Sequence, residues 1–365
     1  MNVLYLATHL NTGGITSYLM NLSTSLKRRG HNIYVASSGG EALRKFEREG
    51  IKFIPIPIKT KAEISPGILV SLCRLSPVIK SENIQIVHSN TRVTQVLGEL
   101  LKRFCGVKHI STGHGFFTMK LTRRLFPCWG DKVIAISAQV RDHLVNDLKV
   151  PAQNISVVHN GIDVEKFRER GAGDRGQQKK EFNLGDGPVI GIIARLSDVK
   201  GHKFLIQAMM EVLEKIPAAT LLIVGEGKER GRLIELTRDL GIEKQVIFIS
   251  SVSDTRLVLS VLDVFVLPSL HEGLGLSLME AMAFGLPVIG SRVGGIPSLI
   301  QDGHNGILVE PEDILGLSGS ILRVLSDKTL AIKLGGNAAD FINRNFGLRM
   351  MAEETERIYQ ECLKN

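Results

Sequence analysis

Two glutamates stand eight positions apart around a glycine-rich turn in the segment from His271 to Gly295. Glu272 precedes the turn Gly273-Leu274-Gly275, and Glu280 lies further on in a stretch of good helix formers. Both fall near the start of a helix predicted over 276–284, where free N–H groups and the helix dipole attract phosphate. Because carboxylates accept hydrogen bonds from sugar and ribose hydroxyl groups, this arrangement suits a sugar nucleotide.

Two cations follow another predicted strand, in the stretch Arg195 to Lys200. Arg195 offers a bidentate fork and Lys200 a point charge, a pair that suits a diphosphate beyond the end of a parallel strand. A solvated basic loop is the alternative. The sequence has no Asp-x-Asp pair for a divalent ion, so these cations and helix N-terminal amides are expected to stabilise a leaving phosphate without a metal.

Glycines and a histidine after other predicted strands could complete the site. Gly13 and Gly14 stand at a helix start, where a phosphate or sugar could approach the backbone amides; a tight turn is the alternative. Gly225 could face a base or ribose, or form a simple β-turn. His114, which two glycines flank, could orient a substrate or act as a base, unless it is a structural histidine.

These residues fall at the ends of short apolar strands in two successive α/β patterns. We predict strands at Val3–Ala7, Ile33–Ala36, Phe53–Ile58, Ile86–Ser89, His109–Ser111, Lys132–Ile136, Ser156–Val158, Val189–Ile193, Ala219–Val224, Val246–Ile249, Val264–Leu267, Val288–Ser291 and Ile307–Val309. The alternation with helices predicts two doubly wound parallel sheets. We expect a first domain over 1–168, a polar linker over 169–182, a second domain over 183–348, and a helix over 349–365 packed on one of the two.

The first strand and turn do not match a dinucleotide-binding fold. That fold carries G-x-G-x-x-G after its first strand and an acidic residue at the end of its second. Here the first strand leads to Gly13-Gly14, and the second ends in Ala36-Ser37-Ser38. A dehydrogenase is therefore excluded.

The composition is that of a globular protein with unevenly placed charge. Of its 365 residues 44% are apolar, but no run approaches the roughly 18 apolar residues of a spanning helix, and the start lacks signal-peptide features, which predicts a cytoplasmic location. Its four cysteines lack metal-ligand spacing, which predicts buried thiols. Residues 1–170 carry 24 Lys and Arg against 12 Asp and Glu, which predicts an anionic partner, lipid headgroups or a glycan ahead of nucleic acid.

One basic and aromatic segment, residues 116–129, is a candidate for contact with an anionic membrane surface. Its cations alternate with large apolar side chains, a pattern typical of a helix that rests on a membrane. A solvated helix with one face in the core fits the pattern equally well. The residues concerned are Lys120, Arg123 and Arg124 among Phe116, Phe117, Leu121, Leu125, Phe126 and Trp129.

Together these motifs resemble the retaining nucleotide-sugar glycosyltransferases of the glycosyltransferase 4 family, also called group 1. The resemblance covers nearly the whole chain, from Gly13-Gly14 through His114 and Asn160-Gly161-Ile162-Asp163 to Arg195, Lys200, Glu272 and Glu280. It implies an α/β fold of the GT-B type, two facing Rossmann-like domains with parallel sheets and an interdomain cleft. The first would hold the acceptor and the second the donor, a UDP- or GDP-sugar, with no other cofactor.

The resemblance implies roles for the donor-binding residues. Glu280 would hold the ribose hydroxyl groups, and Arg195 and Lys200 would bind the diphosphate. Further phosphate contacts would come from the turn at Gly273, through the amides of Leu274, Gly275 and Leu276. Family members often carry Phe where this chain has Leu274, but both turn glycines are present, so phosphate binding is still expected.

It also implies how the sugar is transferred. Glu272 would hold hydroxyl groups of the transferred sugar, His114 would lie against that sugar, and Gly14 would approach the phosphate from the opposite domain. Transfer would retain the anomeric configuration without a metal, by front-face attack in which the departing phosphate takes the acceptor proton. Glu272 is then neither nucleophile nor general base.

The same resemblance indicates a class of acceptor and leaves two alternative functions to consider. The family often builds lipopolysaccharide, capsule or glycolipid, which makes a lipid-linked acceptor at the inner membrane face our hypothesis. Nucleotide-sugar epimerases share the architecture but need carboxylates for proton transfer at the sugar ring, and the first half has few at its strand ends. A non-catalytic sugar-nucleotide binder is the third alternative.

Overall fold

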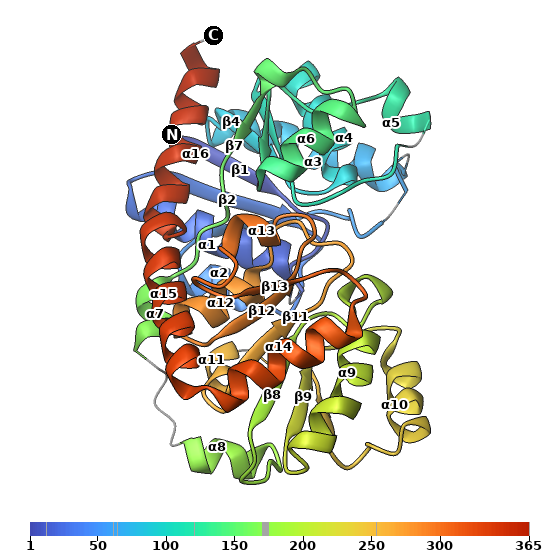
Figure 1. The fold of residues 1–365 in the computed structure, drawn as a ribbon. Helices are drawn as coiled ribbons and strands as arrows, with labels where there is room; N and C mark the ends of the chain where they lie inside the picture. Colours follow the sequence, from blue (N-terminus) through green and yellow to red (C-terminus); the bar gives the residue numbers. More distant parts are fainter. Residues whose placement is uncertain are drawn as a thin grey trace. The chain divides into compact units, whose positions relative to one another are not determined.

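Figure 1 shows the fold in a computed structural model, which describes residues 1–11, 13–60, 62–63, 65–119, 121–169, 175–252 and 254–364. The chain forms two compact units. The first joins Met1–Gly161 with the residues from Leu348 onward, and the second is Ile162–Gly347. Both are Rossmann-like, with one parallel sheet each and helices between successive strands.

The first unit is built on a seven-stranded sheet in the order β3-β2-β1-β4-β5-β6-β7. Interior strand β1 pairs on both sides, with Leu4 opposite Tyr34 and Val87. Its apolar residues are buried on both faces, as expected of a parallel strand covered by helices. The strands are β1 (Asn2–Leu6), β2 (Asn32–Ser37), β3 (Lys52–Pro55), β4 (Ile86–Ser89), β5 (Lys108–Gly113), β6 (Lys132–Ala135) and β7 (Ile155–Val157).

Helices pack on both faces of this sheet, and a cluster of buried apolar side chains lies on each face. Tyr5 and Tyr359 belong to one cluster, and Leu4 belongs to the other, because successive side chains of β1 point to opposite faces. The helices are α1 (Gly14–Arg28), α2 (Leu43–Arg48), α3 (Pro66–Ser81), α4 (Arg92–Cys105), α5 (Leu121–Leu125), α6 (Ala138–Asn146) and α16 (Leu348–Lys364), with η1 (Ala152–Asn154).

The second unit has a six-stranded parallel sheet in the order β10-β9-β8-β11-β12-β13. Its strands are β8 (Val189–Ile193), β9 (Thr220–Val224), β10 (Val246–Ile249), β11 (Val264–Leu267), β12 (Val288–Ser291) and β13 (Ile307–Val309). Its helices are α7 (Val164–Arg168), α8 (Arg175–Glu181), η2 (Asp198–Lys200), α9 (His202–Lys215), α10 (Arg230–Asp239), α11 (Thr255–Leu259), α12 (Leu276–Phe284), α13 (Ile296–Leu299), α14 (Ile314–Ser326) and α15 (Lys328–Asn345). Each predicted strand overlaps an observed one.

The division into units differs from the predicted boundaries. It falls at Gly161 and Ile162 rather than near 168, because α7 packs against α12 of the second unit. Within the predicted linker 169–182, residues 170–174 lie outside the described residues, and the rest includes α8, which Arg175 ties to the second unit through a 2.7 Å ion pair with Asp263. The final helix, α16, packs against α1 in the first unit.

Composition led to predictions about membrane-spanning helices and about the cysteines. Across the part of the chain that the structure describes, none of the helices is long and apolar enough to cross a membrane. All four cysteines are free, but only Cys362 is buried, whereas Cys73 is exposed, so the prediction of buried thiols is wrong for Cys73. Cys73 lies on α3, away from the sheet core.

Candidate functional site

The loops after β8 and β11 come together where the strand order of the second sheet reverses. In open parallel sheets ligands bind beyond the carboxyl ends of the strands at such a reversal. The N–H of Leu270 donates to the Val199 carbonyl oxygen at 2.8 Å. Gly201 lies so close to Pro268 that an added Cβ would overlap the Pro268 carbonyl oxygen. The two loops that carry the predicted cations and Glu272 therefore form one packed surface.

Lys200 and Glu272 form an ion pair on this surface. Lys200 Nζ lies 2.6 Å from Glu272 Oε2, and the two side chains are only 19% and 13% exposed. The other carboxylate oxygen accepts a 3.1 Å hydrogen bond from the Gly273 N–H. Residues 72 positions apart thus meet on one surface, and Glu272 has no unoccupied carboxylate oxygen.

Arg195 reaches the solvent from the same loop as Lys200. Its side chain is exposed and makes no hydrogen bond or ion pair with a described residue of its unit. The Leu196 N–H donates to the Glu226 carbonyl oxygen at 2.9 Å, and Gly225, at a φ of 147°, lies directly on the Ala194 carbonyl. A larger residue at 225 would push this loop away. In the free protein Gly225 therefore positions the loop that carries Arg195.

The helix start after Glu272 is open to a ligand. Gly275 adopts a φ of 98°, which only glycine takes readily, and no side chain caps the first N–H groups of α12. Gly295 packs on the Gly273 carbonyl oxygen, and its N–H donates to the Glu272 carbonyl oxygen at 3.1 Å. Leu274 is buried beneath the turn. The turn Gly273-Leu274-Gly275 thus leads into a helix start that has no side-chain cap.

Glu280 lies in the second turn of α12 and is partly buried. Burial raises the pKa of its carboxyl group from 4.5 to about 7, while the Thr255 hydroxyl and the charge of Lys166 lower it and Asp254 raises it. Near neutral pH the carboxyl group therefore exchanges readily between its neutral and charged forms. Hydroxyl groups of a ribose would favour the charged form.

His202, at the first position of α9, was not singled out by the sequence. It is 2% exposed, and neither ring nitrogen has a hydrogen-bond partner among the described residues. Burial, and then the charge of Lys200, lowers the pKa of His202 to about 4. It is therefore a neutral neighbour of Lys200 and adds no charge to the site.

In the first unit, Gly13, Gly14 and His114 follow strands near the reversal between β1 and β4. A Cβ added to Gly13, the N-cap of α1, would meet nothing within 4 Å, so the surface beside it is open. His114 Nε2 lies 3.0 Å from Asn90 Oδ1, and burial lowers the pKa of His114 to about 3. A ring that stays neutral suits orientation of a substrate better than proton abstraction.

Asn90 also belongs to this group, although no sequence motif singled it out. It stands directly after β4 and is 2% exposed. The available signal was a polar residue just beyond a buried strand, at the same sheet edge as Gly13-Gly14 and His114.

The segment 116–129 is not one amphipathic helix. Only Leu121–Leu125 is helical, and Lys120 lies outside the described residues. Arg123 is 8% exposed and stacks on two aromatic rings, 4.8 Å from the centroid of Phe117 and 5.5 Å from that of Trp129. Its apolar neighbours point outward instead, with Leu121, Leu125 and Phe126 each at least 64% exposed.

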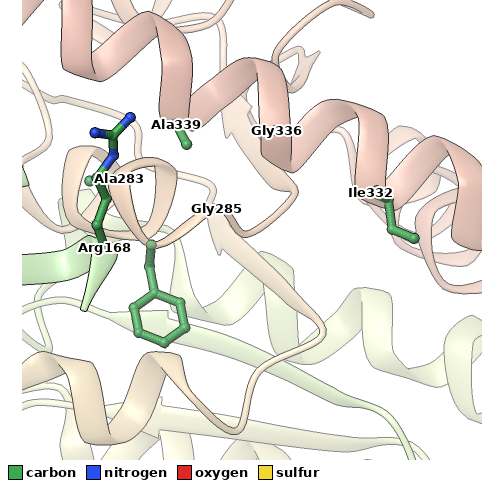
Figure 2. A pocket seen from close by; sticks show the side chains of 7 residues that line it. Arg168, Ala283, Gly285, Ile332, Gly336 and Ala339 are labelled. Atoms are coloured by element: carbon green, nitrogen blue, oxygen red, sulfur yellow. The ribbon is translucent and has the colours of Figure 1, made fainter. Parts of the chain in front are cut away.

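A pocket of about 390 Å³ lies elsewhere in the second unit. Figure 2 shows it beside Ala283 and Gly285, at the end of α12 opposite to Glu272, with Ile332 and Ala339 of α15 on its other side. None of the predicted site residues lines it. In the described residues, no group of three or more His, Cys, Asp or Glu side chains is arranged to hold a metal ion.

Each half of the chain matches a family model of glycosyltransferases. Residues 174–341 match the family model "Glycosyl transferases group 1", and residues 12–166 match "Glycosyltransferase Family 4". N-acetyl-alpha-D-glucosaminyl L-malate synthase of Bacillus anthracis is 28% identical over 97% of this chain and 96% of its own length. UDP-Gal:alpha-D-GlcNAc-diphosphoundecaprenol alpha-1,3-galactosyltransferase of Escherichia coli is 29% identical over 81% of this chain and 80% of its own.

Solved structures share the fold over the full length. The Anabaena protein Alr3699/HepE, crystallised with UDP-glucose, superposes with a TM-score of 0.87 at 20% identity, over 99% of this chain and 100% of that one. This likeness confirms the predicted GT-B class of two Rossmann-like domains with parallel sheets. With both halves matched to family models, the chain belongs to the group 1 glycosyltransferases of glycosyltransferase family 4.

Proposed function

We propose that this protein is a retaining, metal-independent hexosyltransferase that moves a hexose-type sugar from a UDP- or GDP-sugar to a glycan or lipid-linked acceptor. The main support for this proposal is that Lys200, Glu272 and the uncapped start of α12 lie together at the strand-order reversal of the second sheet. Such a site offers positive charge and N–H groups to a diphosphate, and a carboxylate to sugar hydroxyl groups.

The names of relatives support these substrate classes. The Escherichia coli relative is named for UDP-Gal and for a GlcNAc-diphosphoundecaprenol acceptor, and HepE was crystallised with UDP-glucose. For this chain we propose a place in the synthesis of cell-envelope polysaccharide, lipopolysaccharide or glycolipid. It would act in the cytoplasm, peripherally on the inner face of the membrane.

The second unit would bind the donor. Arg195 and Lys200 hold the diphosphate together with the amides at the start of α12, and Glu280 accepts hydrogen bonds from the ribose. Glu272 accepts hydrogen bonds from the transferred sugar once the diphosphate competes for Lys200. His114 and Gly14, which follow strands of the first unit's sheet, would contact the sugar and the phosphate.

Transfer would need no protein nucleophile. The bond between the anomeric carbon and the diphosphate oxygen breaks while the acceptor hydroxyl oxygen bonds to the same face of that carbon. The acceptor proton passes to the leaving phosphate oxygen. Arg195 and Lys200 stabilise the negative charge that develops on this phosphate. Glu272, already bonded by Lys200 and the Gly273 N–H, is suited to binding the sugar rather than attacking it.

The test supplies the purified protein with a panel of UDP- and GDP-sugars, a lipid-linked acceptor extract, and either EDTA or added Mg²⁺. We expect a glycosylated acceptor by mass spectrometry, with the anomeric configuration of the donor by NMR and no loss of rate in EDTA. A thermal-shift screen with UDP and GDP identifies the donor base.

Other outcomes would point to the competing functions. Donor consumption without a glycosylated product would indicate an epimerase or hydrolase and overturn the transferase proposal. Tight nucleotide-sugar binding with neither product nor donor consumption across the panel would indicate a non-catalytic binder.

A further inference from the structure

Asn90 lies where the first sheet's topology places a ligand. It directly follows β4, which stands between β1 and β5 in the sheet, and the strand order reverses between β1 and β4. The loop after β1 carries Gly13, and His114 directly follows β5. The buried Asn90 side chain therefore sits between the two predicted substrate-binding segments of this unit.

The orientation of the Asn90 carboxamide is fixed by the backbone around it. Its Nδ2 lies 3.4 Å from the Leu6 carbonyl oxygen and 3.3 Å from the His88 carbonyl oxygen. Carbonyl oxygens only accept hydrogen bonds, so the amide nitrogen must face them. The carboxamide oxygen is thus directed to His114, whose Nε2 lies 3.0 Å away.

This orientation determines the tautomer of His114. A carboxamide oxygen only accepts, so Nε2 must carry the hydrogen, and in the neutral ring Nδ1 then has a free lone pair. No described residue of the unit bonds Nδ1, and the side chain keeps part of its surface exposed.

A second contact holds the ring in place. Tyr18 packs edge-on against His114 with ring centroids 4.7 Å apart, and its hydroxyl lies 3.3 Å from Thr112 Oγ1. Thr112 Oγ1 in turn lies 2.6 Å from His88 Nε2. Position and tautomer of the imidazole are therefore both set by buried partners.

We propose that Asn90 is a positioning residue that holds His114 as its Nε2–H tautomer, so that Nδ1 accepts a hydrogen bond from a substrate hydroxyl group. The inference rests on the proposed function for the identity of that substrate, a sugar. His114 then acts as a fixed hydrogen-bond acceptor and not as a general acid. Burial supports this role because it keeps the ring neutral across the working pH range.

The direct test is the tautomer itself. Protein labelled with ¹⁵N-histidine is studied by long-range ¹H–¹⁵N NMR, with the His114 signals assigned by their loss in His114→Gln. We expect an N–H type signal for Nε2 and a bare-nitrogen signal for Nδ1, unchanged between pH 5 and pH 8. A hydrogen on Nδ1 in the wild-type protein would overturn the proposal without any substrate or variant.

Two variants then test the role of Asn90. Asn90→Ala should give mixed tautomers and lower kcat/KM about tenfold, because the acceptor is no longer held in one state. Asn90→Asp should stabilise the charged ring, so that His114 titrates near neutral pH and kcat/KM falls as the pH falls. Wild-type kcat/KM in both variants across pH 5–8 would overturn the proposal.

Asn305→Ala is the matched control. Asn305 is also buried, but it lies in the second unit, where its Oδ1 accepts from the Gln301 N–H at 2.7 Å and its Nδ2 donates to the Leu299 carbonyl oxygen at 3.1 Å. It should leave the His114 signals and the pH profile unchanged. If the wild-type protein transfers no sugar, the proposed function fails, and the tautomer measurement still decides this inference separately.

Discussion

Lys200 and Glu272 neutralise each other in the free protein, so the proposed donor binding would be an exchange of partners. A diphosphate brings more negative charge to Lys200 than one carboxylate does, and it leaves Glu272 able to accept from sugar hydroxyl groups. Exposed Arg195 needs no such exchange. Lys200 would therefore have to leave a carboxylate partner before it binds phosphate, whereas Arg195 would not, although both would stabilise the leaving phosphate.

Replacing either cation should slow transfer. We expect Arg195→Ala and Lys200→Ala each to lower kcat by about 100-fold or more, the scale seen when one preorganised charge stabiliser is removed. Steady-state kinetics with the donor identified by thermal shift would measure it. The control is Lys228→Ala, since that side chain is 72% exposed and its nearest carboxylates lie 4.0 Å away. Full activity in both site variants would refute the assignment.

Glu280 should couple nucleotide binding to pH. Its pKa is raised from 4.5 to about 7, so the folded protein takes up a proton that the unfolded chain releases, and this contribution to stability is lost as the pH rises from 4.5 through 7. Ribose hydroxyl groups favour the ionised form, so binding should release protons near pH 7 and tighten as the pH rises from 6 to 8.

Titration calorimetry in two buffers of different ionisation enthalpy would detect the released protons. Glu280→Gln keeps the shape of the side chain but cannot ionise, so it should bind the nucleotide with no proton release. Equal proton release in wild type and variant would show that another group titrates.

At the scale of elements, the short helix α5 carries the candidate membrane contact. Among the described residues of 116–129 only Leu121–Leu125 is helical, so a helix along the whole segment is wrong. Arg123 turns inward onto Phe117 and Trp129, where a guanidinium gains from stacking on aromatic faces. Leu121, Leu125 and Phe126 are left exposed on a unit that carries most of the chain's positive charge. Apolar side chains beside cations suit an anionic lipid surface.

We therefore expect the protein to float with anionic vesicles at low salt and to detach as the salt concentration rises. The triple change Leu121→Ser, Leu125→Ser and Phe126→Ser should lower the bound fraction severalfold, because each change removes apolar area from the interface. Leu315→Ser is the control, since Leu315 is 75% exposed in the second unit. If the wild-type protein fails to float at low salt, the membrane proposal should be dropped.

At the scale of the whole molecule, the end of the chain completes the first unit. Tyr359 of α16 is fully buried, with its hydroxyl 2.9 Å from the Tyr5 hydroxyl and 2.6 Å from His88 Nδ1. Burial lowers the pKa of His88 well below 6.5, so this ring is a neutral partner. The last helix is thus joined by polar contacts to β1 and β4 of the first sheet.

Tyr359→Phe should destabilise the first unit by about 1–3 kcal/mol, because it leaves buried partners without their hydrogen bonds. Urea unfolding followed by circular dichroism would give the change in the free energy of unfolding. Tyr34→Phe is the control, because its hydroxyl bonds the partly exposed Glu82 at 2.6 Å and water can replace it. Equal losses in the two variants would contradict a special role for the buried contact.

The sequence by itself determined the local elements and the order of the motifs. Strands such as Val189–Ile193 and the helix over 276–284 were predicted with their observed ends, because apolar runs and glycine stops act within a few residues. The family followed from the same motifs, most of which stand at predicted strand ends. The roles assigned to His114, Glu272 and Glu280 stay predictions.

The tertiary structure alone decided which of these elements meet. The 2.6 Å pair of Lys200 and Glu272, the contact of Asn90 with His114 and the return of α16 to the first unit join residues far apart in the chain. Periodicity describes which face of an element is buried but not the neighbour that buries it. That choice depends on strand order and on packing over the whole unit, because every buried polar group must also find its partner there.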